Sequence, residues 1–380
     1  NKSSNFDIKK ISYDDQKVYN LLSTGKTTGL FQLESSGMRE ALMQMKPNCL
    51  EDIIALVALY RPGPMSNISI YNECKHGKKQ PDYLHPKLEK ILKPTYGVII
   101  YQEQVMQIAQ TLSGFSPGEA DLLRRAMGKK KRAELERQKS RFVEGAFNKG
   151  ISKDIAAGIF LKIEPFAEYG FNKSHAAAYA IIAYQTAYLK TYYPEEFFAA
   201  SMSTELSNQK KLGEFCEEIK RLKINIIRPD INTCYGDFYS DNNNFYYALG
   251  AIKNVGLDAV KNIVNERNNN GKFKSVFDFL NRVSPKDINK LQLEGLTKAG
   301  AFDSIIENRR SFYDSIPNII LKSKSIYENK LQNQIDLFSS NEGDDNEKIL
   351  NQKTEWNFQE KMMKEFETVG FYISDHPLNQ

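Results

Sequence analysis

The pattern of hydrophobic and polar positions predicts a chain built mainly from helices. Residues 50–60 carry apolar side chains at helical spacing, and we expect that helix to stop at Arg61-Pro62-Gly63-Pro64, because two prolines cannot continue it. The same reasoning predicts further helices, listed here by their expected ranges: from Gln102 onward, from Pro117 to Gly128, 130–147, His175 to about Tyr192, on to about Leu222, 257–267 and 287–299.

Short strands are expected at few places. They are Thr27 to Leu33 as a turn into a strand, Val98 to Tyr101, Ile224 to Ile227, and Tyr246 to Ile252 as a strand or hairpin edge. The expected fold class is therefore mainly α with a few short strands. Residues 331–351 are polar and acid-rich, which is typical of a linker.

Composition narrows the class of protein. The chain has 380 residues, and 41% of them are hydrophobic, enough for the cores of two or three domains. Its cysteines (Cys49, Cys74, Cys216 and Cys234) form no C-x-x-C pair, which argues against a zinc site or a disulfide framework and favours a reducing, cytoplasmic location. No apolar run approaches 18 residues, so no membrane partner is expected.

Positive charge is concentrated in one stretch. Residues 121–149 contain ten basic and four acidic residues, an excess of six, whereas the whole chain has a net charge of +5. Such a local excess indicates a polyanionic partner. The chain begins without Met and continues to Gln380 without an obvious end, so we interpret it as an internal piece of a longer protein.

The first candidate binding element lies in this basic stretch. Ser116-Pro117-Gly118-Glu119 has the pattern of a capping box that starts a helix carrying Arg124 and Arg125. Lys129, Lys130 and Lys131 follow the Gly128 break. Arginine's planar fork suits bidentate phosphate contacts, which points to a nucleic acid backbone or a triphosphate. An ordinary solvated helix is an equally good interpretation of the charges alone.

The second candidate is Tyr169-Gly170-Phe171-Asn172-Lys173-Ser174-His175. A glycine, polar donors and a helix start together form a geometry that receives an anion, since free backbone N–H groups and the helix dipole favour negative charge there. Lys173 adds a full charge, and His175 can donate a hydrogen bond or stack. The alternative is an ordinary helix start capped by Ser174.

The third candidate is Gly250-Ala251-Ile252-Lys253-Asn254-Val255-Gly256, which precedes a predicted helix. A hydrophobic-x-Gly turn at a helix start is the helix-hairpin-helix pattern, in which glycine lets backbone N–H groups approach a DNA phosphate. A weaker second copy spans Leu296 to Phe302, with Gly295 and Gly300. Plain loop closure is the alternative.

A fourth candidate is Gln334-Ile335-Asp336-Leu337-Phe338, a short peptide in polar sequence whose apolar pair can dock into a partner's groove. The usual signs of catalysis are not found: the sequence has no Asp-x-Asp, no phosphate-binding P-loop motif and no metal-spaced His/Cys cluster. We therefore expect no catalytic residue in this chain.

Several long strings carry a resemblance to a known family. In order along the chain they are Phe31 to Ser35, Ala58 to Pro64, Tyr96 to Met106, Leu123 to Lys130 and Gly170 to His175. Together they closely resemble the alpha subunit of bacterial DNA polymerase III, a C-family replicative polymerase, and the resemblance runs essentially end to end.

This resemblance implies roles for the candidate residues. Arg124, Arg125, Lys173 and His175 would bind the triphosphate of the incoming dNTP. Lys129, Lys130, Lys131 and the turn Lys253-Asn254-Val255-Gly256 would contact primer-template DNA, and Gln334 to Phe338 would bind the sliding clamp. The catalytic Mg²⁺ would be held by palm-domain aspartates that precede this piece. Other subunits of the replicative holoenzyme are further implied partners.

The resemblance also implies a domain order. Residues 1–45 would begin the fingers next to the palm, 46–200 would form the fingers, 201–305 a helix-hairpin-helix domain, and 306–380 a linker with the clamp peptide leading to an OB domain. Two other hypotheses remain open: a non-enzymatic helix-hairpin-helix module that binds DNA in repair, and a protein-protein scaffold acting through Gln334 to Phe338.

Overall fold

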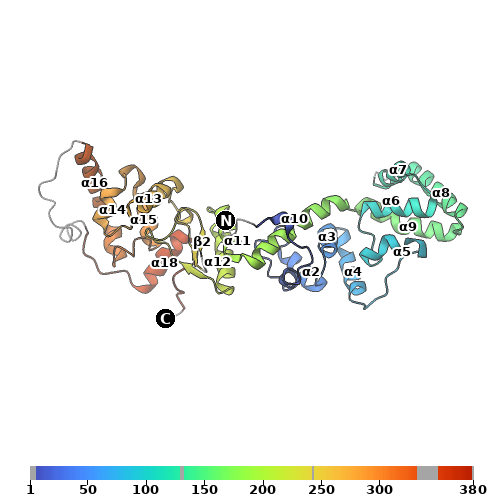
Figure 1. Cartoon of the computed structure of the whole chain (residues 1–380), viewed down its shortest axis with the longest axis horizontal. Helices are drawn as coiled ribbons and strands as arrows, with labels where there is room; N and C mark the ends of the chain where they lie inside the picture. The colour runs from blue at the N-terminus through green and yellow to red at the C-terminus, as the bar shows by residue number, and fades with distance from the viewer. Residues whose placement is uncertain (1–5, 129–131, 242–243, 332–349, 379–380) are drawn as a thin grey trace. The chain divides into compact units, whose positions relative to one another are not determined.

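The computed structural model describes residues 6–128, 132–241, 244–331 and 350–378. The chain divides into two compact units, Asn1–Tyr192 and Tyr193–Gln380, each with its own buried core. Helices dominate both units (Figure 1), which confirms the expectation of a mainly α fold with a few short strands.

Among its described residues, unit 1 contains helices joined by turns and no strand. Its helices are α1 (Gln16–Ser23), α2 (Ser36–Met45), α3 (Leu50–Leu59), α4 (Asn67–Lys75), α5 (Glu89–Leu92), α6 (Gln102–Ser113), α7 (Pro117–Gly128), α8 (Arg132–Asn148), α9 (Lys153–Tyr169) and α10 (Lys173–Tyr192), with 3-10 turns at Ile8–Lys10, Pro64–Ser66, Pro86–Leu88 and Lys93–Thr95.

Unit 2 combines helices with one small sheet. Its helices are α11 (Pro194–Ser203), α12 (Gln209–Arg221), α13 (Leu257–Asn270), α14 (Val276–Arg282), α15 (Lys290–Lys298), α16 (Arg309–Leu331) and α18 (Phe358–Val369), with 3-10 turns at Leu249–Ala251 and Pro285–Asp287. The strands β1 (Asn225–Ile227), β2 (Tyr239–Asp241) and β3 (Asn244–Tyr246) lie in the order β1-β3-β2. β1 pairs parallel and β2 antiparallel with β3.

The sequence pattern predicted several helix ends correctly. α3 ends at Leu59, just before the two prolines, as expected. The predicted capping box at α7 is confirmed: Ser116 N–H donates to the Glu119 carboxylate at 2.9 Å, and Glu119 N–H donates to the Ser116 hydroxyl at 3.4 Å. These ends depend on neighbours in sequence, so the sequence pattern was sufficient to find them.

Two strand predictions were wrong. Residues 27–33 form turns, because Gly29 and Gln32 adopt positive φ angles (79° and 64°) that interrupt an extended chain. The segment Tyr246 to Ile252 is not a strand either: β3 ends at Tyr246, and a 3-10 turn occupies Leu249–Ala251. Val98 to Tyr101 is buried, but its only ladder contact among the described residues is one bridge from Tyr101 to Phe171.

The helices α6 to α9 enclose one apolar core. Phe142 on α8 and Phe160 on α9 are fully buried, with ring centroids 5.5 Å apart. Figure 1 shows these four helices gathered in one part of unit 1. This packing fixes α7, and with it Arg124 and Arg125, against the start of α6.

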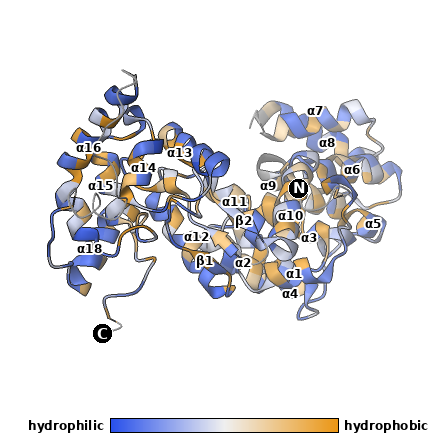
Figure 2. Cartoon of the chain, turned by 60° about the vertical axis from the view of Figure 1, so that its left-hand side comes forward, coloured by the Kyte–Doolittle hydropathy of each residue, from blue (hydrophilic) through white to orange (hydrophobic). Residues whose placement is uncertain are grey.

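The long helix α10 packs closely on α3 because it presents small residues to it. Ala176, Ala180, Ala183 and Ala187 recur at helical spacing and are fully buried. Small side chains let two helices approach closely, and α3 offers the buried side chains of Ile53 and Leu56 in return. Figure 2 shows that single helices carry both hydrophobic and hydrophilic residues.

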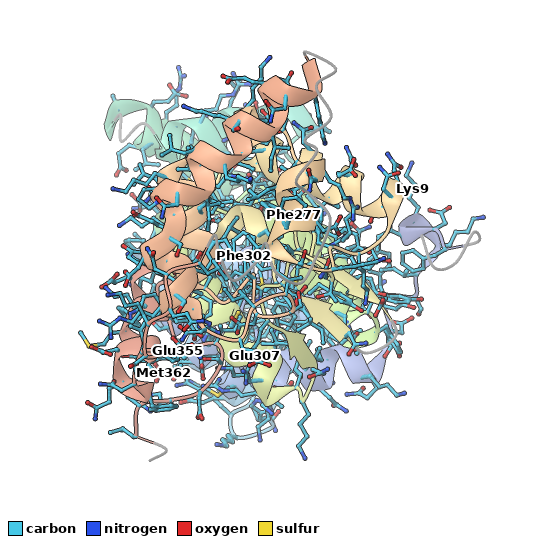
Figure 3. All side chains as sticks on the ribbon, turned by 90° about the vertical axis from the view of Figure 1, so that its left-hand side faces the viewer. Lys9, Phe277, Phe302, Glu307, Glu355 and Met362 are labelled. Carbon is cyan, nitrogen blue, oxygen red and sulfur yellow. The ribbon has the colours of Figure 1, made fainter. Side chains whose placement is uncertain are left out.

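The core of unit 2 is aromatic. Phe302 stacks on Phe312 of α16 with ring centroids 4.5 Å apart and meets Phe279 of α14 edge-on at 5.4 Å. Figure 3 shows Phe302 inside the unit, surrounded by side chains, with Glu355 and Met362 near the start of α18.

The four cysteines are free thiols. Within the described residues, no helix is long and apolar enough to cross a bilayer.

Candidate functional site

The start of α6 is joined to the residues before α10. Phe171 N–H donates to the Ile100 carbonyl, and Gln102 N–H donates to the Phe171 carbonyl, each at 3.0 Å. The side-chain oxygen of buried Gln104 accepts from the N–H groups of Ile100 and Tyr101 at 2.8 and 3.0 Å, which holds this segment extended up to the first turn of the helix. The contact therefore places the two helix starts side by side.

This close approach requires a glycine at position 170. A Cβ atom there would lie 2.6 Å from the Phe166 carbonyl oxygen and 3.2 Å from the Gln102 nitrogen. Both are backbone atoms, so neither can move away as a flexible side chain would. Gly170 thus permits the contact between the segment before α10 and the start of α6.

The N-terminus of α10 is capped by two side chains. Asn172 Oδ1 accepts a hydrogen bond from His175 N–H at 2.8 Å, the pattern of an N-cap residue. The Glu103 carboxylate accepts from Lys173 N–H at 3.0 and 3.2 Å and from Asn172 Nδ2 at 3.0 Å. The alternative of a Ser174 cap is therefore wrong, and a carboxylate of the chain itself already occupies a position suited to an anion.

Basic and aromatic groups surround this helix start. Lys173 Nζ lies 5.4 Å from the centre of the Tyr101 ring. The exposed His175 ring lies 4.6 Å from Tyr179 and 5.4 Å from Phe171. The Arg61 guanidinium lies 4.4 Å from the centre of the Phe171 ring, and burial lowers its pKa. Arg61, in the Arg-Pro-Gly-Pro turn after α3, was not among the predicted site residues.

The arginines of α7 share one carboxylate. Asp121 Oδ1 accepts from Arg124 Nε at 2.9 Å and Nη2 at 2.8 Å, while its Oδ2 lies 2.7 Å from Arg125 Nη2. Hydrogen bonding to Arg124, together with the charges of both arginines, holds the pKa of Asp121 below its usual value. The two guanidinium groups are thus held next to each other.

The structure brings the first two predicted elements to the same helix turn. Arg124 Nη1 lies 3.4 Å from Gln102 Oε1, while the next residue, Glu103, accepts from Lys173 N–H. Gln102 and Glu103 were not predicted as site residues. Both lie in the string Tyr96 to Met106, which contributed to the family resemblance without suggesting a role for either residue.

Two other predicted sets lie outside the described residues. They are Lys129, Lys130 and Lys131, between α7 and α8, and the peptide Gln334, Ile335, Asp336, Leu337 and Phe338, after α16.

The predicted hairpin of unit 2 is a turn before α13. Asn254 adopts a left-handed conformation (φ 66°), and Gly256 precedes the helix without making a side-chain cap. The turn rests on α15: a Cβ atom on Gly295 would lie 2.7 Å from the Lys253 carbonyl oxygen. Lys253 N–H donates to the Thr368 carbonyl at 3.0 Å, which ties the turn to α18. These contacts fix the turn from two sides.

The four predicted DNA-contact residues of this turn differ in exposure. Lys253, Asn254 and Gly256 are exposed, whereas the Val255 side chain is buried and anchors the turn. Val255 can therefore meet a ligand only through its backbone. A groove of about 490 Å³ runs along the turn and is lined by residues such as Ser207 and Leu257.

The described residues offer no grouping of three or more His, Cys, Asp or Glu side chains arranged to hold a metal ion. Asp121 and Glu103 are each engaged by neighbouring donors. The described part of the chain therefore does not fit a catalytic Mg²⁺ site.

Comparison with known proteins shows which proteins the chain is similar to. Residues 1–150 match the model of the bacterial DNA polymerase III alpha subunit finger domain, and residues 223–312 match a helix-hairpin-helix motif. The chain is 51% identical over 373 residues to the DNA polymerase III subunit alpha of Caulobacter vibrioides. Over 98% of its length this chain is similar to bacterial DNA polymerase III alpha subunits.

Other relatives agree and set the extent of the match. The DNA polymerase III alpha subunits of Borreliella burgdorferi and Staphylococcus epidermidis are 46% and 42% identical over 98% and 99% of this chain. The chain spans about a third of the length of these relatives. It covers 32% of the Caulobacter protein, 33% of the Borreliella protein and 35% of the Staphylococcus protein. Arg61, Glu103 and Arg124 lie within the finger-domain match, whereas Lys173 lies beyond it.

Proposed function

We propose that this chain is the fingers and DNA-binding segment of a replicative DNA-directed DNA polymerase. In this proposal Arg124, Arg125, Lys173 and His175 bind the triphosphate of the incoming dNTP. One observation carries it: Gln102 and Glu103, adjacent on α6, contact Arg124 and the N-terminus of α10. Two cationic elements beside one helix turn suit a single ligand with several negative charges.

The proposed role of these residues is to position and neutralise phosphates. In phosphoryl transfer the protein mainly orients the reacting groups and stabilises developing charge. Arg124 and Arg125 offer planar donor forks, and Lys173 offers a mobile point charge. Mg²⁺ supplies metal-assisted catalysis in such polymerases, and we propose that it is held outside this chain.

The aromatic neighbours give this site a second capacity. The rings of Phe171, His175 and Tyr179 follow one another at 5.4 and 4.6 Å, and the Arg61 guanidinium covers Phe171. Such a row of rings can stack on a nucleobase or ribose while the basic groups hold the phosphates. We propose that the His175 ring, which packs on Tyr179, also contributes to this stacking.

The remaining proposals concern partners. We propose that the exposed turn at Lys253, Asn254 and Gly256 contacts the phosphate backbone of primer-template DNA, together with Lys129 to Lys131. We propose that Gln334 to Phe338 binds the sliding clamp and that other holoenzyme subunits bind elsewhere on the full-length protein, which acts in the cytoplasm. The match to a helix-hairpin-helix motif supports the DNA contact.

Steady-state kinetics of the full-length protein test the proposal. Arg124→Ala and Arg125→Ala should raise the KM for dNTP and lower kcat, with little change in affinity for primer-template DNA. Arg137→Ala is the matched control, since Arg137 lies on α8 and pairs with Glu134. Normal dNTP kinetics in both site variants would exclude these residues from the nucleotide site.

The response to dNTP also distinguishes the polymerase from the alternative hypothesis of a repair module. A non-enzymatic DNA-binding module would show a steep salt dependence of DNA affinity and no response to dNTP. The finger-domain match over residues 1–150 favours the polymerase, because a repair module would need only the helix-hairpin-helix part.

A further inference from the structure

Two carboxylates of the chain accept hydrogen bonds from the same donor groups that the proposed function assigns to phosphates. Asp121 bridges Arg124 and Arg125, and Glu103 accepts from the first backbone N–H of α10. We propose that Asp121 and Glu103 act as internal counter-ions, and that a triphosphate binds by exchanging with them. This inference rests on the proposed function and adds two residues that determine nucleotide affinity.

The geometry of Arg124 favours exchange over simple addition. Its Nε and Nη2, one of the two pairs that can grip a phosphate bidentately, both bond to Asp121 Oδ1, and its Nη1 contacts Gln102. All three nitrogens of this guanidinium therefore have partners within the chain. A phosphate can take this Nε–Nη2 position only if Asp121 leaves it.

The exposure of these groups makes the exchange feasible. The side chains of Arg124, Arg125 and Asp121 are 26%, 61% and 32% exposed, so water and a ligand can reach the pair. Ion pairs at such sites contribute little to stability, because solvent screens them. A triphosphate carries several negative charges and can replace one carboxylate on two arginines with a larger electrostatic gain.

Glu103 occupies the N-terminus of α10 as Asp121 occupies the arginines of α7. Both of its oxygens accept from Lys173 N–H, and one also accepts from Asn172 Nδ2. A helix N-terminus is a common place for a phosphate, and here a carboxylate takes it. Since Glu103 follows Gln102, both internal carboxylates lie beside the same first turn of α6. Their release would free the two cationic elements together.

Exchange and positioning predict opposite results for one substitution. Asp121→Asn keeps the shape and the Oδ1 acceptor but removes the competing charge. If the carboxylate exchanges with phosphate, the variant binds triphosphate more tightly. If it only orients the arginines, the variant binds more weakly. Glu103→Gln follows the same logic at α10, because glutamine retains an acceptor for Lys173 N–H.

The test is isothermal titration of the full-length protein with inorganic triphosphate and with dNTP at one fixed ionic strength. Exchange predicts that Asp121→Asn and Glu103→Gln each tighten binding by about twofold to fivefold. Glu119→Gln is the matched control: it removes one negative charge from the same helix, but Glu119 pairs with Arg141 and bonds to Ser116. Its affinity should stay close to that of the unmodified protein.

The outcomes are distinguishable from failure of the proposed function. If Arg124→Ala weakens binding while Asp121→Asn also weakens it or leaves it unchanged, the exchange is wrong and the nucleotide site stands. A gain of equal size in Glu119→Gln would show a general charge effect and would also overturn the exchange. If Arg124→Ala leaves triphosphate binding unchanged, the proposed function itself fails.

Discussion

Arg124 reaches the first residue of α6, with its Nη1 atom 3.4 Å from the side-chain oxygen of Gln102. Gln102 in turn donates its backbone N–H to Phe171, two residues before Lys173. A basic helix and a helix N-terminus that are far apart in sequence therefore meet at one turn. This relationship supports a shared anionic ligand more strongly than either basic element does alone.

The glycine at position 170 gives the first prediction. Gly170→Ala should lower the free energy of unfolding by about 1–3 kcal/mol, because its Cβ atom would press on two backbone atoms. It should also raise the KM for dNTP by separating α10 from α6. Chemical denaturation and steady-state kinetics measure the two effects. Gly158→Ala in α9 is the control: nothing lies within 4 Å of its Cβ position, so stability should rise slightly.

The hairpin of unit 2 gives the second prediction. Lys253→Ala should weaken DNA binding for all sequences alike and reduce the slope of log affinity against log salt by about 1, as expected for one lost phosphate contact. Fluorescence anisotropy at several salt concentrations measures the slope. Lys220→Ala on α12, whose side chain contacts the Tyr372 carbonyl, serves as the control. Equal slopes in both variants would argue against a DNA contact at this turn.

Alkaline pH should destabilise unit 2, which is the third prediction. Burial raises the pKa of Cys216 to about 12 and that of Tyr247 well above its usual value. Both groups stay protonated when folded and ionise near their ordinary values when unfolded. The unfolded state thus binds fewer protons above about pH 9, and the free energy of unfolding falls as pH rises.

A substitution isolates the part due to Tyr247. Its hydroxyl has no hydrogen-bond partner within the described residues. Tyr247→Phe should therefore cost no stability at pH 7 and should flatten the alkaline decline, as measured by urea unfolding at pH 7 and pH 10.5. A loss of several kcal/mol at neutral pH would show that the Tyr247 hydroxyl makes a hydrogen bond in the folded protein.

The fourth prediction concerns Glu355 (labelled in Figure 3), which precedes α18 in sequence and contacts the first two residues of α16. Its carboxylate accepts from the N–H groups of Arg309 at 3.0 Å and Arg310 at 3.2 Å. Burial alone would raise the pKa of Glu355. These two bonds, together with those from Trp356 N–H and Lys361, outweigh burial and hold the pKa below its usual value. The stabilisation is fully present above the ordinary carboxyl pKa and is lost as pH falls from there through the lowered pKa of the folded state.

Glu355→Gln should therefore lower the free energy of unfolding by about 1–2 kcal/mol at pH 7, with a difference that narrows as the solution is acidified toward pH 3. Urea unfolding across this pH range measures it. Glu307→Gln, an exposed neighbour, should have little effect. A difference between Glu355→Gln and the unmodified protein that stays constant with pH would contradict the account.

The sequence predicted features that depend on neighbouring residues. The end of α3 before Pro62 and the capping box of α7 follow from local chemistry, and both were found correctly. The pair of Asp121 with Arg124 and Arg125 could also have been foreseen. The spacing is three and four residues, which brings side chains together on any helix.

Other features depend on contacts between distant residues. Glu103 and Lys173 are 70 positions apart, so no local pattern indicates that one caps the helix of the other. The run from Tyr246 to Ile252 was mistaken for a strand because most of it is buried, and a buried apolar run has no alternation that separates a strand from a packed turn. Tertiary packing decided both cases.

A double-mutant cycle on nucleotide binding tests the central claim most directly. Calorimetry would compare the dNTP affinity of the full-length protein with that of Arg124→Ala, Lys173→Ala and the double variant. Each single substitution should weaken binding, and the two effects should deviate from additivity by about 0.5–3 kcal/mol, because both side chains meet one triphosphate. Unchanged affinity in either single variant, or effects that add within about 0.3 kcal/mol, would contradict a shared site.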